Sequence, residues 1–109
     1  MVLSFGERNW KARVRMGGSR YDLVLLYHLL RILYEKQLAS EELALKDLWL
    51  EYRTRTGVKV NYYTVKRHVD LAVEKGLVEK AGTRPALLKV TKKGVDYMFL
   101  FERLSELIK

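Results

Sequence analysis

The chain has 109 residues, of which 49% are hydrophobic and 31% are charged. This length fits one compact domain, and the composition excludes a disordered tail. The formal net charge of +8 and the isoelectric point near 9.8 predict a surface that attracts polyanions, with nucleic acid as the first candidate.

The chain contains no cysteine, which excludes disulfide frameworks, thiolate nucleophiles and cysteine-based zinc sites. The N-terminus lacks the pattern of a secretory signal, and the most apolar stretch, residues 23–33, is shorter than the ~20 residues that a bilayer requires. We therefore expect a cytoplasmic protein without a membrane partner. Asparagine and glutamine are scarce, a bias typical of proteins from hot environments.

Residues 1–19 are predicted to form a basic strand or arm. Apolar and basic side chains alternate over residues 10–16, so that Lys11, Arg13 and Arg15 share one face of a strand. Two interpretations stay open: an edge strand whose charges discourage pairing with other strands, or a basic arm that lies along a phosphate backbone. Residues 20–109 are predicted to form the folded domain.

Residues 20–36 have the apolar spacing of an amphipathic helix, with Leu23, Leu26, Leu30 and Leu33 on its main face. A second apolar stripe runs along the same helix. Its members are Leu25, Leu29 and Ile32. A monomer of this size would struggle to cover both faces, so we expect the second stripe to lie in a homodimer interface.

Two further helices are predicted to follow as a helix–turn–helix. Ser40 is a suitable N-cap for the first helix, which runs through Tyr52 and ends at Gly57. Asn61 is a suitable N-cap for the second helix, which spans residues 62–75 and stops at Gly76. The helical period places five apolar side chains of the second helix on one face: Tyr62, Val65, Val69, Ala72 and Val73. The opposite face carries Tyr63, Thr64, Arg67 and Leu71, with Lys66 and His68 at its borders.

A hairpin and a last helix complete the predicted domain. Residues 77–80 and 87–91 have the composition of strands, and residues 82–85 form the turn between them. The last helix is predicted over residues 92–108. Five of its side chains are expected to face the core: Tyr97, Leu100, Leu104, Leu107 and Ile108. Val95 and Phe99 are expected on the opposite side, as further dimer contacts.

The stretch over residues 61–80 resembles winged-helix regulators, including the MarR-like and PadR-like groups and small archaeal members. The similarity lies in Thr64-Val65-x-Arg67-His68, in the exit Lys75-Gly76-Leu77-Val78, and in residues 90–94, and it covers about residues 20–108. It implies an α+β, mostly helical fold: a winged helix-turn-helix with a two-stranded wing and a C-terminal dimerisation helix. In such a fold the helix over residues 62–75 enters a major groove, and the wing touches the neighbouring backbone.

The sequence predicts a DNA-binding site on the recognition helix and the wing. The expected helix contacts are Asn61, Tyr63, Thr64, Lys66, Arg67 and His68. The expected wing contacts are Lys80, Thr83, Arg84 and Lys89. Arg67 can bind a guanine edge or a phosphate, whereas Tyr63 can donate to a backbone oxygen. The alternative interpretation is that these residues form an ordinary solvated helix face.

No catalytic pattern is apparent in the sequence. His28 and His68 are separated by forty residues, and no carboxylate spacing around them indicates a metal or acid–base site. We therefore expect no enzymatic activity, no metal and no cofactor. The expected function is sequence-selective binding of double-stranded DNA by a homodimeric transcription regulator. Two alternatives remain: a non-specific chromosome-associated protein, and a winged-helix module that binds another protein.

Overall fold

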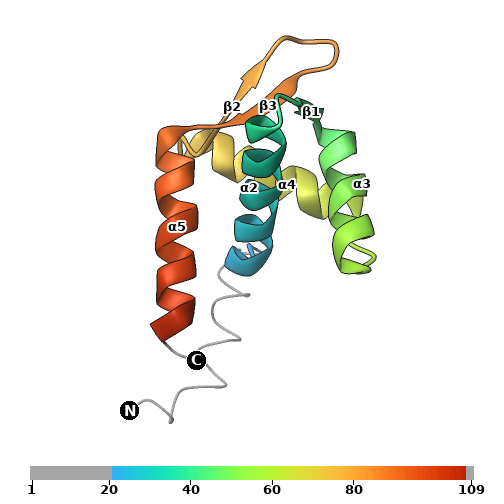
Figure 1. Ribbon diagram of the computed structural model, residues 1–109. Coiled ribbons are helices and arrows are strands. Elements are labelled where there is room, and N and C mark those ends of the chain that lie inside the picture. Colours follow the sequence, from blue (N-terminus) through green and yellow to red (C-terminus); the bar gives the residue numbers. More distant parts are fainter. Residues whose placement is uncertain (1–20, 108–109) are drawn as a thin grey trace.

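The computed structural model describes residues 21–107, which form four helices and one antiparallel sheet of three strands. In chain order the elements are α2 (Leu23–Leu38), β1 (Leu43–Ala44), α3 (Leu45–Thr56), α4 (Tyr62–Glu74), β2 (Val78–Ala81), β3 (Leu87–Val90) and α5 (Lys92–Leu107). The fold is therefore α+β and mostly helical, as the sequence predicted, and its layout is compatible with a winged helix. Figure 1 shows the strands at one end of the helices, while the C-terminal end of α5 points away from them.

Helix α2 is the central element of the core. It begins at Leu23 rather than at residue 19 or 20, because the Asp22 carboxylate caps it by accepting the backbone N–H of Val24 at 2.9 Å. Six of its side chains are buried, on more than one side of the helix: Leu25, Leu26, Leu29, Leu30, Ile32 and Leu33. They pack against α3, α4, α5 and β3. The expectation that Leu25, Leu29 and Ile32 form a dimer interface is wrong, because the protomer's own core covers them.

Helix α3 begins five residues after the predicted cap. Residues Leu43–Ala44 form strand β1, which pairs with β3 through Leu43 and Leu88. The Asp47 carboxylate then accepts the backbone N–H of Ala44 at 3.2 Å and stabilises the first turn of α3. The prediction that Ser40 caps this helix is therefore wrong. Ser40 instead has a φ of 61° and lies in the turn after α2.

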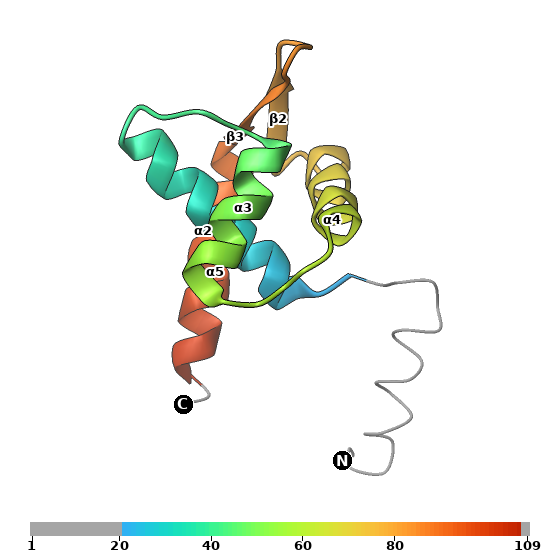
Figure 2. The ribbon, with the colours of Figure 1, turned by 90° about the vertical axis from the view of Figure 1, so that its right-hand side faces the viewer.

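The sheet has the order β1-β3-β2, so that β3 is its central strand. The register pairs Val78 with Val90 and Lys80 with Leu88. The strands of the hairpin contribute three buried side chains to the core, which fix the base of the hairpin on the helices: Val78, Leu88 and Val90. The tip of the hairpin extends beyond the helices, as Figure 2 shows.

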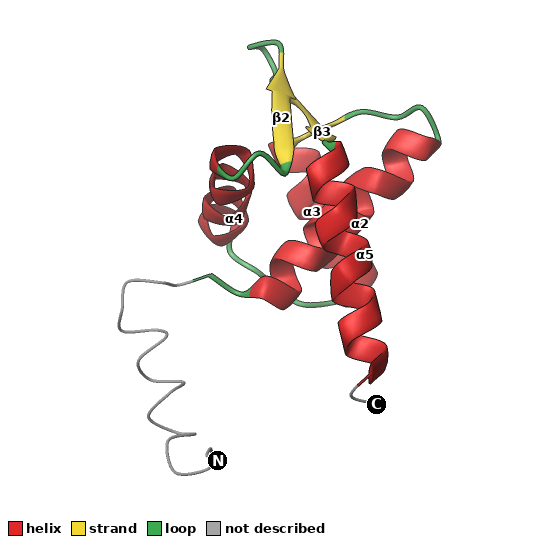
Figure 3. Cartoon of the chain, turned by 90° about the vertical axis from the view of Figure 1, so that its left-hand side faces the viewer, coloured by secondary structure: helices red, strands yellow, loops and turns green. Residues whose placement is uncertain are grey.

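The buried residues of helix α5, Gly94 and Met98, lie in its first half. A Cβ at Gly94 would lie 2.2 Å from the carbonyl oxygen of Leu77 and 2.6 Å from a methyl group of Val90, so only glycine permits this approach. Met98, one turn later, is fully buried. In Figure 3, α4 lies at the left of the helices and α5 runs down toward the right, so the two helices present separate faces.

Two expectations for α5 are wrong. Leu100, Leu104 and Leu107 were expected in the core, but all three are exposed. Val95 was expected on the opposite side, but it packs against the core. Gly94 and Met98 define the inward side, and the three leucines occupy the side opposite Met98.

Candidate nucleic-acid interface

Helix α4 is held by one face and leaves the other face open. The Asn61 side chain accepts the backbone N–H of Tyr63 at 2.7 Å, which caps the helix as the sequence predicted. Val65, Val69 and Ala72 are buried in the core. Tyr63 and Arg67, on the opposite side, are exposed. The predicted division of α4 into an inward and an outward face is therefore confirmed for these residues.

The side chain of Trp49 fixes the turn between α3 and α4. Its indole N–H donates to the carbonyl oxygen of Val60 at 2.8 Å, directly before the α4 cap. The Arg53 guanidinium lies 5.1 Å from the indole centroid, and the Tyr62 ring packs edge-on against the indole at 5.5 Å. These contacts hold the N-terminal end of α4 in place relative to α3.

The N-terminal half of α4 carries the outward cationic and aromatic side chains. Tyr63 is 69% exposed, and Lys66 and Arg67 are also exposed, whereas Thr64 is half-buried. The C-terminal half carries the carboxylates of Asp70 and Glu74. The outward face of α4 is therefore polar, with positive charges in its N-terminal half and negative charges in its C-terminal half.

His68 does not belong to this outward face. Its side chain is 1% exposed, and its Nε2 accepts the backbone N–H of Asp22 at 2.8 Å. Because Nε2 accepts, the ring proton is assigned to Nδ1, which lies 2.7 Å from the Thr64 carbonyl oxygen and donates to it. The Tyr21 ring packs edge-on against the imidazole at 5.5 Å. The prediction that His68 contacts DNA is wrong, because this side chain joins α4 to the start of α2.

The hairpin brings some of the predicted residues to α4, but not all of them. Lys80, Thr83 and Arg84 are exposed. The Nζ of Lys80 lies 3.7 Å from the Asp70 carboxylate, so β2 meets the outward side of α4. Lys89 pairs with Glu79 across the hairpin and therefore occupies the other face, where its Nζ lies 3.9 Å from Glu42.

Sequence reasoning missed the role of Asp70. Its carboxylate lies 2.9 Å from the Nζ of Lys66 and 3.7 Å from the Nζ of Lys80. The hydrogen bond to Asp70 raises the pKa of Lys66 above its ordinary value. The i,i+4 spacing of Lys66 and Asp70 is a signal that could have revealed the first contact. Nothing in the sequence indicates the second, because Lys80 comes from a different element.

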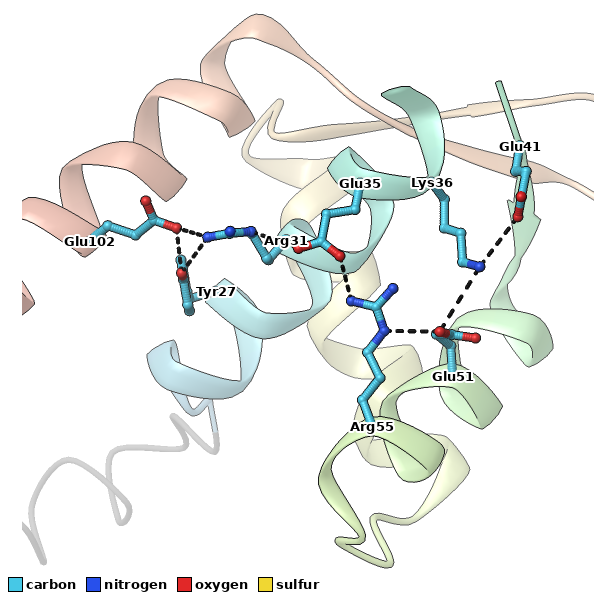
Figure 4. Close-up of polar contacts among 8 residues, drawn as sticks. All are labelled: Tyr27, Arg31, Glu35, Lys36, Glu41, Glu51, Arg55 and Glu102. Atoms are coloured by element: carbon cyan, nitrogen blue, oxygen red, sulfur yellow. Dashed lines mark hydrogen bonds and ion pairs between the residues drawn. The ribbon is translucent and has the colours of Figure 1, made fainter. Parts of the chain in front are cut away.

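Several basic side chains of α2 and α3 are paired with carboxylates. A chain of ion pairs crosses α5, α2 and α3, as Figure 4 shows, and it begins where Glu102 accepts from Tyr27 and Arg31. The further nitrogen–oxygen distances are 2.9 Å for Arg31–Glu35, 2.7 Å for Arg55–Glu35, 2.9 Å for Arg55–Glu51, 4.0 Å for Lys36–Glu51 and 3.3 Å for Lys36–Glu41. The hydrogen bond from Arg55 is the main cause that lowers the pKa of Glu35. Within residues 21–107, Arg67 and Arg84 are among the basic side chains that have no ion pair.

A cavity with a volume of about 460 Å³ lies between α2 and α5. Tyr27, His28 and Phe101 supply its aromatic wall, while Arg31 and Glu102 supply an internal ion pair. Glu106 adds a further carboxylate, so the cavity is poorly suited to an anionic ligand. Among the described residues there is no group of three His, Cys, Asp or Glu side chains that could hold a metal.

The outward side of α5 forms a second, apolar surface. Leu100, Leu104 and Leu107 are 57%, 53% and 79% exposed, and their spacing is that of a coiled-coil seam. Phe99, which was expected in the dimer interface, is also exposed and lies beside them. No helix within residues 21–107 is long and apolar enough to cross a bilayer.

Lys11, Arg13 and Arg15, the three predicted contacts of the basic arm, lie outside the described residues. Comparison of the chain with models of known protein families, with curated proteins and with solved structures finds no match.

Proposed function

We propose that this chain is a winged-helix transcription regulator that binds double-stranded DNA sequence-selectively as a homodimer, on the nucleoid. The observation that carries the proposal is the outward face of α4: Tyr63 and Arg67 are exposed there, beside a hairpin whose tip carries the exposed Arg84. The exposed guanidinium groups of Arg67 and Arg84 can bind phosphates, and the net charge of +8 on the whole chain attracts polyanions.

The arrangement of the elements supports this proposal. A helix, a short strand, a helix–turn–helix and a hairpin follow one another, and the short strand β1 pairs with the hairpin strand β3. In winged-helix proteins the second helix of the pair enters the major groove with its N-terminal residues on the base edges. Here those residues include Tyr63 and Arg67, and the hairpin is well placed to meet the flanking backbone.

Each side chain has a distinct role in the proposed complex. The planar guanidinium of Arg67 binds the O6 and N7 atoms of a guanine, and the Tyr63 hydroxyl donates to a phosphate oxygen. Arg84 binds a phosphate or reaches into the neighbouring minor groove. Phosphate contacts supply most of the affinity, and the contacts of Arg67 with base edges supply the selectivity.

The leucine stripe of α5 is proposed as the dimer interface, in place of Leu25, Leu29 and Ile32. Exposed leucines at positions i, i+4 and i+7 match the seam by which two copies of a helix pack together. A two-fold axis through α5 implies a palindromic target with half-sites about 10 base pairs, or a multiple of this, apart. Sedimentation at micromolar concentration should give the mass of a dimer, and a monomer alone would contradict this part of the proposal.

The DNA proposal is tested by binding to fluorescent duplexes over a series of salt concentrations. Arg67→Ala should weaken binding by about 10-fold, and Arg84→Ala should lower the slope of log affinity against log salt by roughly one. Lys36→Ala is the control, because Lys36 lies on α2 and is already paired with Glu41 and Glu51. Equal effects of all three substitutions would contradict the proposed geometry.

The same titration separates the two alternatives. Binding that shows little preference among duplex sequences would favour a general chromosome-associated protein. No duplex binding even at low salt would favour a module that docks on an acidic protein.

A further inference from the structure

Asp70 is the one carboxylate within the described residues that holds cations from both the recognition helix and the hairpin. It lies 2.9 Å from the Nζ of Lys66 on α4 and 3.7 Å from the Nζ of Lys80 on β2. Both lysines belong to the predicted DNA-binding set. A phosphate group that recruits either lysine must therefore compete with Asp70 for it.

Helix stability does not account for this carboxylate. An acidic residue four positions before a lysine supports a helix better than the reverse order, and here the lysine comes first. The side chains of Lys66 and Asp70 are 48% and 46% exposed, so the pair contributes little to folding. Asp70 therefore affects the exposed lysines beside it more than it affects folding.

The geometry points to Asp70 as a selectivity residue, an inference that rests on the proposed function: its carboxylate restrains Lys66 and Lys80 from phosphate contacts. Any duplex offers phosphates, whatever its sequence. While both lysines are restrained, a duplex without base contacts to α4 binds weakly. A duplex whose bases also contact Arg67 gains enough affinity to draw the two lysines away from Asp70 to its phosphates.

The carboxylate also repels the DNA backbone directly. It lies one turn after Arg67 on the same outward side of α4, where the sign of the charge changes along the helix. The N-terminal half of α4 is therefore favoured in the groove over the C-terminal half. Asp70 thus influences the orientation of α4 in the groove and also lowers the affinity for DNA of random sequence.

The test compares Asp70→Asn with the matched control Glu51→Gln. Both changes remove one negative charge, and Glu51 also holds two cations, Arg55 at 2.9 Å and Lys36 at 4.0 Å, but on the side of α2 and α3 shown in Figure 4. The probe is a fluorescent duplex of random sequence, titrated at several salt concentrations. Asp70→Asn should raise affinity at low salt by about 10-fold and steepen the salt slope by about two, since two lysines become available. Glu51→Gln should stay within about twofold of the wild type.

A second measurement uses a duplex selected by the wild-type chain from a random pool. The ratio of its affinity to that of the random duplex should fall about 10-fold in Asp70→Asn. Replacing Lys66 and Lys80 by Met in the Asp70→Asn background should remove the gain on random DNA. This third variant shows that the gain comes from these lysines rather than from an altered fold.

The outcomes separate the inference from the function on which it rests. If the wild-type chain binds no duplex at low salt, the proposed function fails. If it binds DNA but Asp70→Asn and Glu51→Gln shift the affinity equally, only the role of Asp70 fails, because the effect is then one of overall charge. An unchanged affinity ratio in Asp70→Asn would also overturn only the role in selectivity. A selection that yields no preferred sequence would overturn both that role and the sequence-selective function.

Discussion

The outward faces of α4 and α5 differ in chemistry, although both helices are anchored in the same way. Each helix buries one side in the core, through Val65 and Val69 in α4 and through Gly94 and Met98 in α5. The opposite side of α4 is polar and charged, whereas the opposite side of α5 carries three exposed leucines.

Under the proposed function, this difference suits a different partner for each face. A charged face remains hydrated until a phosphate or a base edge replaces water, and its binding depends on salt. An apolar face gains free energy when a similar surface covers it. We therefore interpret α4 as the face for DNA and α5 as the face for a second copy of the chain.

The largest expected effect is that of Gly94→Ala, which prevents the close approach of α5 to Leu77 and Val90. The added methyl group would meet the Leu77 carbonyl oxygen, and a backbone atom cannot rotate away as a side chain can. We expect a loss of about 3 kcal/mol in the free energy of unfolding, measured by urea denaturation. A variant as stable as the wild type would show that α5 does not pack on the hairpin base as described.

The double substitution Leu100→Glu with Leu104→Glu should break the apolar face of α5. Carboxylates in a helix seam would repel across the two-fold axis of the proposed dimer, so the variant should sediment as a monomer. Binding to a palindromic duplex should then weaken on the order of 100-fold, because the two half-sites are no longer bound by one particle. The control Leu38→Glu changes an exposed leucine of α2 outside this stripe and should leave the dimer intact.

The substitution His68→Phe tests the inward side of α4. It keeps an aromatic ring but removes the acceptor of the Asp22 N–H, so stability should fall by about 2 kcal/mol. The DNA affinity of the folded variant should change less than in Arg67→Ala. A loss of DNA affinity as large as that of Arg67→Ala, with unchanged stability, would place His68 on the DNA side after all.

A smaller effect of opposite sign is expected for Tyr97→Phe. The Tyr97 hydroxyl is buried without a hydrogen-bond partner in the part of the chain that the structure describes, and burial raises its pKa. Removing it should stabilise the fold by up to about 1 kcal/mol in thermal unfolding. Tyr63→Phe, on the exposed face of α4, is the control and should leave stability unchanged. Destabilisation by Tyr97→Phe would indicate a partner for the hydroxyl, such as a group of the second copy.

The smallest effect concerns Glu35, in the ion pairs that join α2 to α3. Its pKa is lowered below the usual 4.5, chiefly by the hydrogen bond from Arg55, so its ionised form favours the folded state. This contribution is complete above about pH 4.5 and is lost as the pH falls through the folded-state pKa. Glu35→Gln should therefore flatten the dependence of unfolding free energy on pH below 4.5. If the variant and the wild type show the same dependence of unfolding free energy on pH below 4.5, Glu35 makes no such contribution.

Local patterns in the sequence located most elements. Asn61 and Gly76 set the ends of α4 to within a residue, and the strand-like composition on both sides of the turn at residues 82–85 predicted the hairpin. These signals are contained within one element, so they can be recognised without knowing the rest of the fold. The same holds for the outward orientation of Arg67.

Features that depend on tertiary placement were missed. The start of α3 is set by the pairing of Leu43 with Leu88, which no local pattern reveals. The burial of Leu29 follows from elements that pack on several sides of α2, whereas the exposure of Leu104 follows from the seating of α5 at Gly94. Within the candidate site, Asp70 and Lys80 come together only because β2 returns beside α4.

The contacts of Trp49 give the molecule a built-in optical reporter. The chain has two tryptophans, so replacing Trp10 by Phe leaves Trp49 as the single indole. This indole contacts Arg53 and Tyr62 and donates a hydrogen bond to Val60, the residue before the α4 cap. Its emission should respond when the α3–α4 turn shifts on a bound duplex. Stopped-flow fluorescence of that variant would therefore follow the proposed docking of α4 on DNA in real time, without an attached dye.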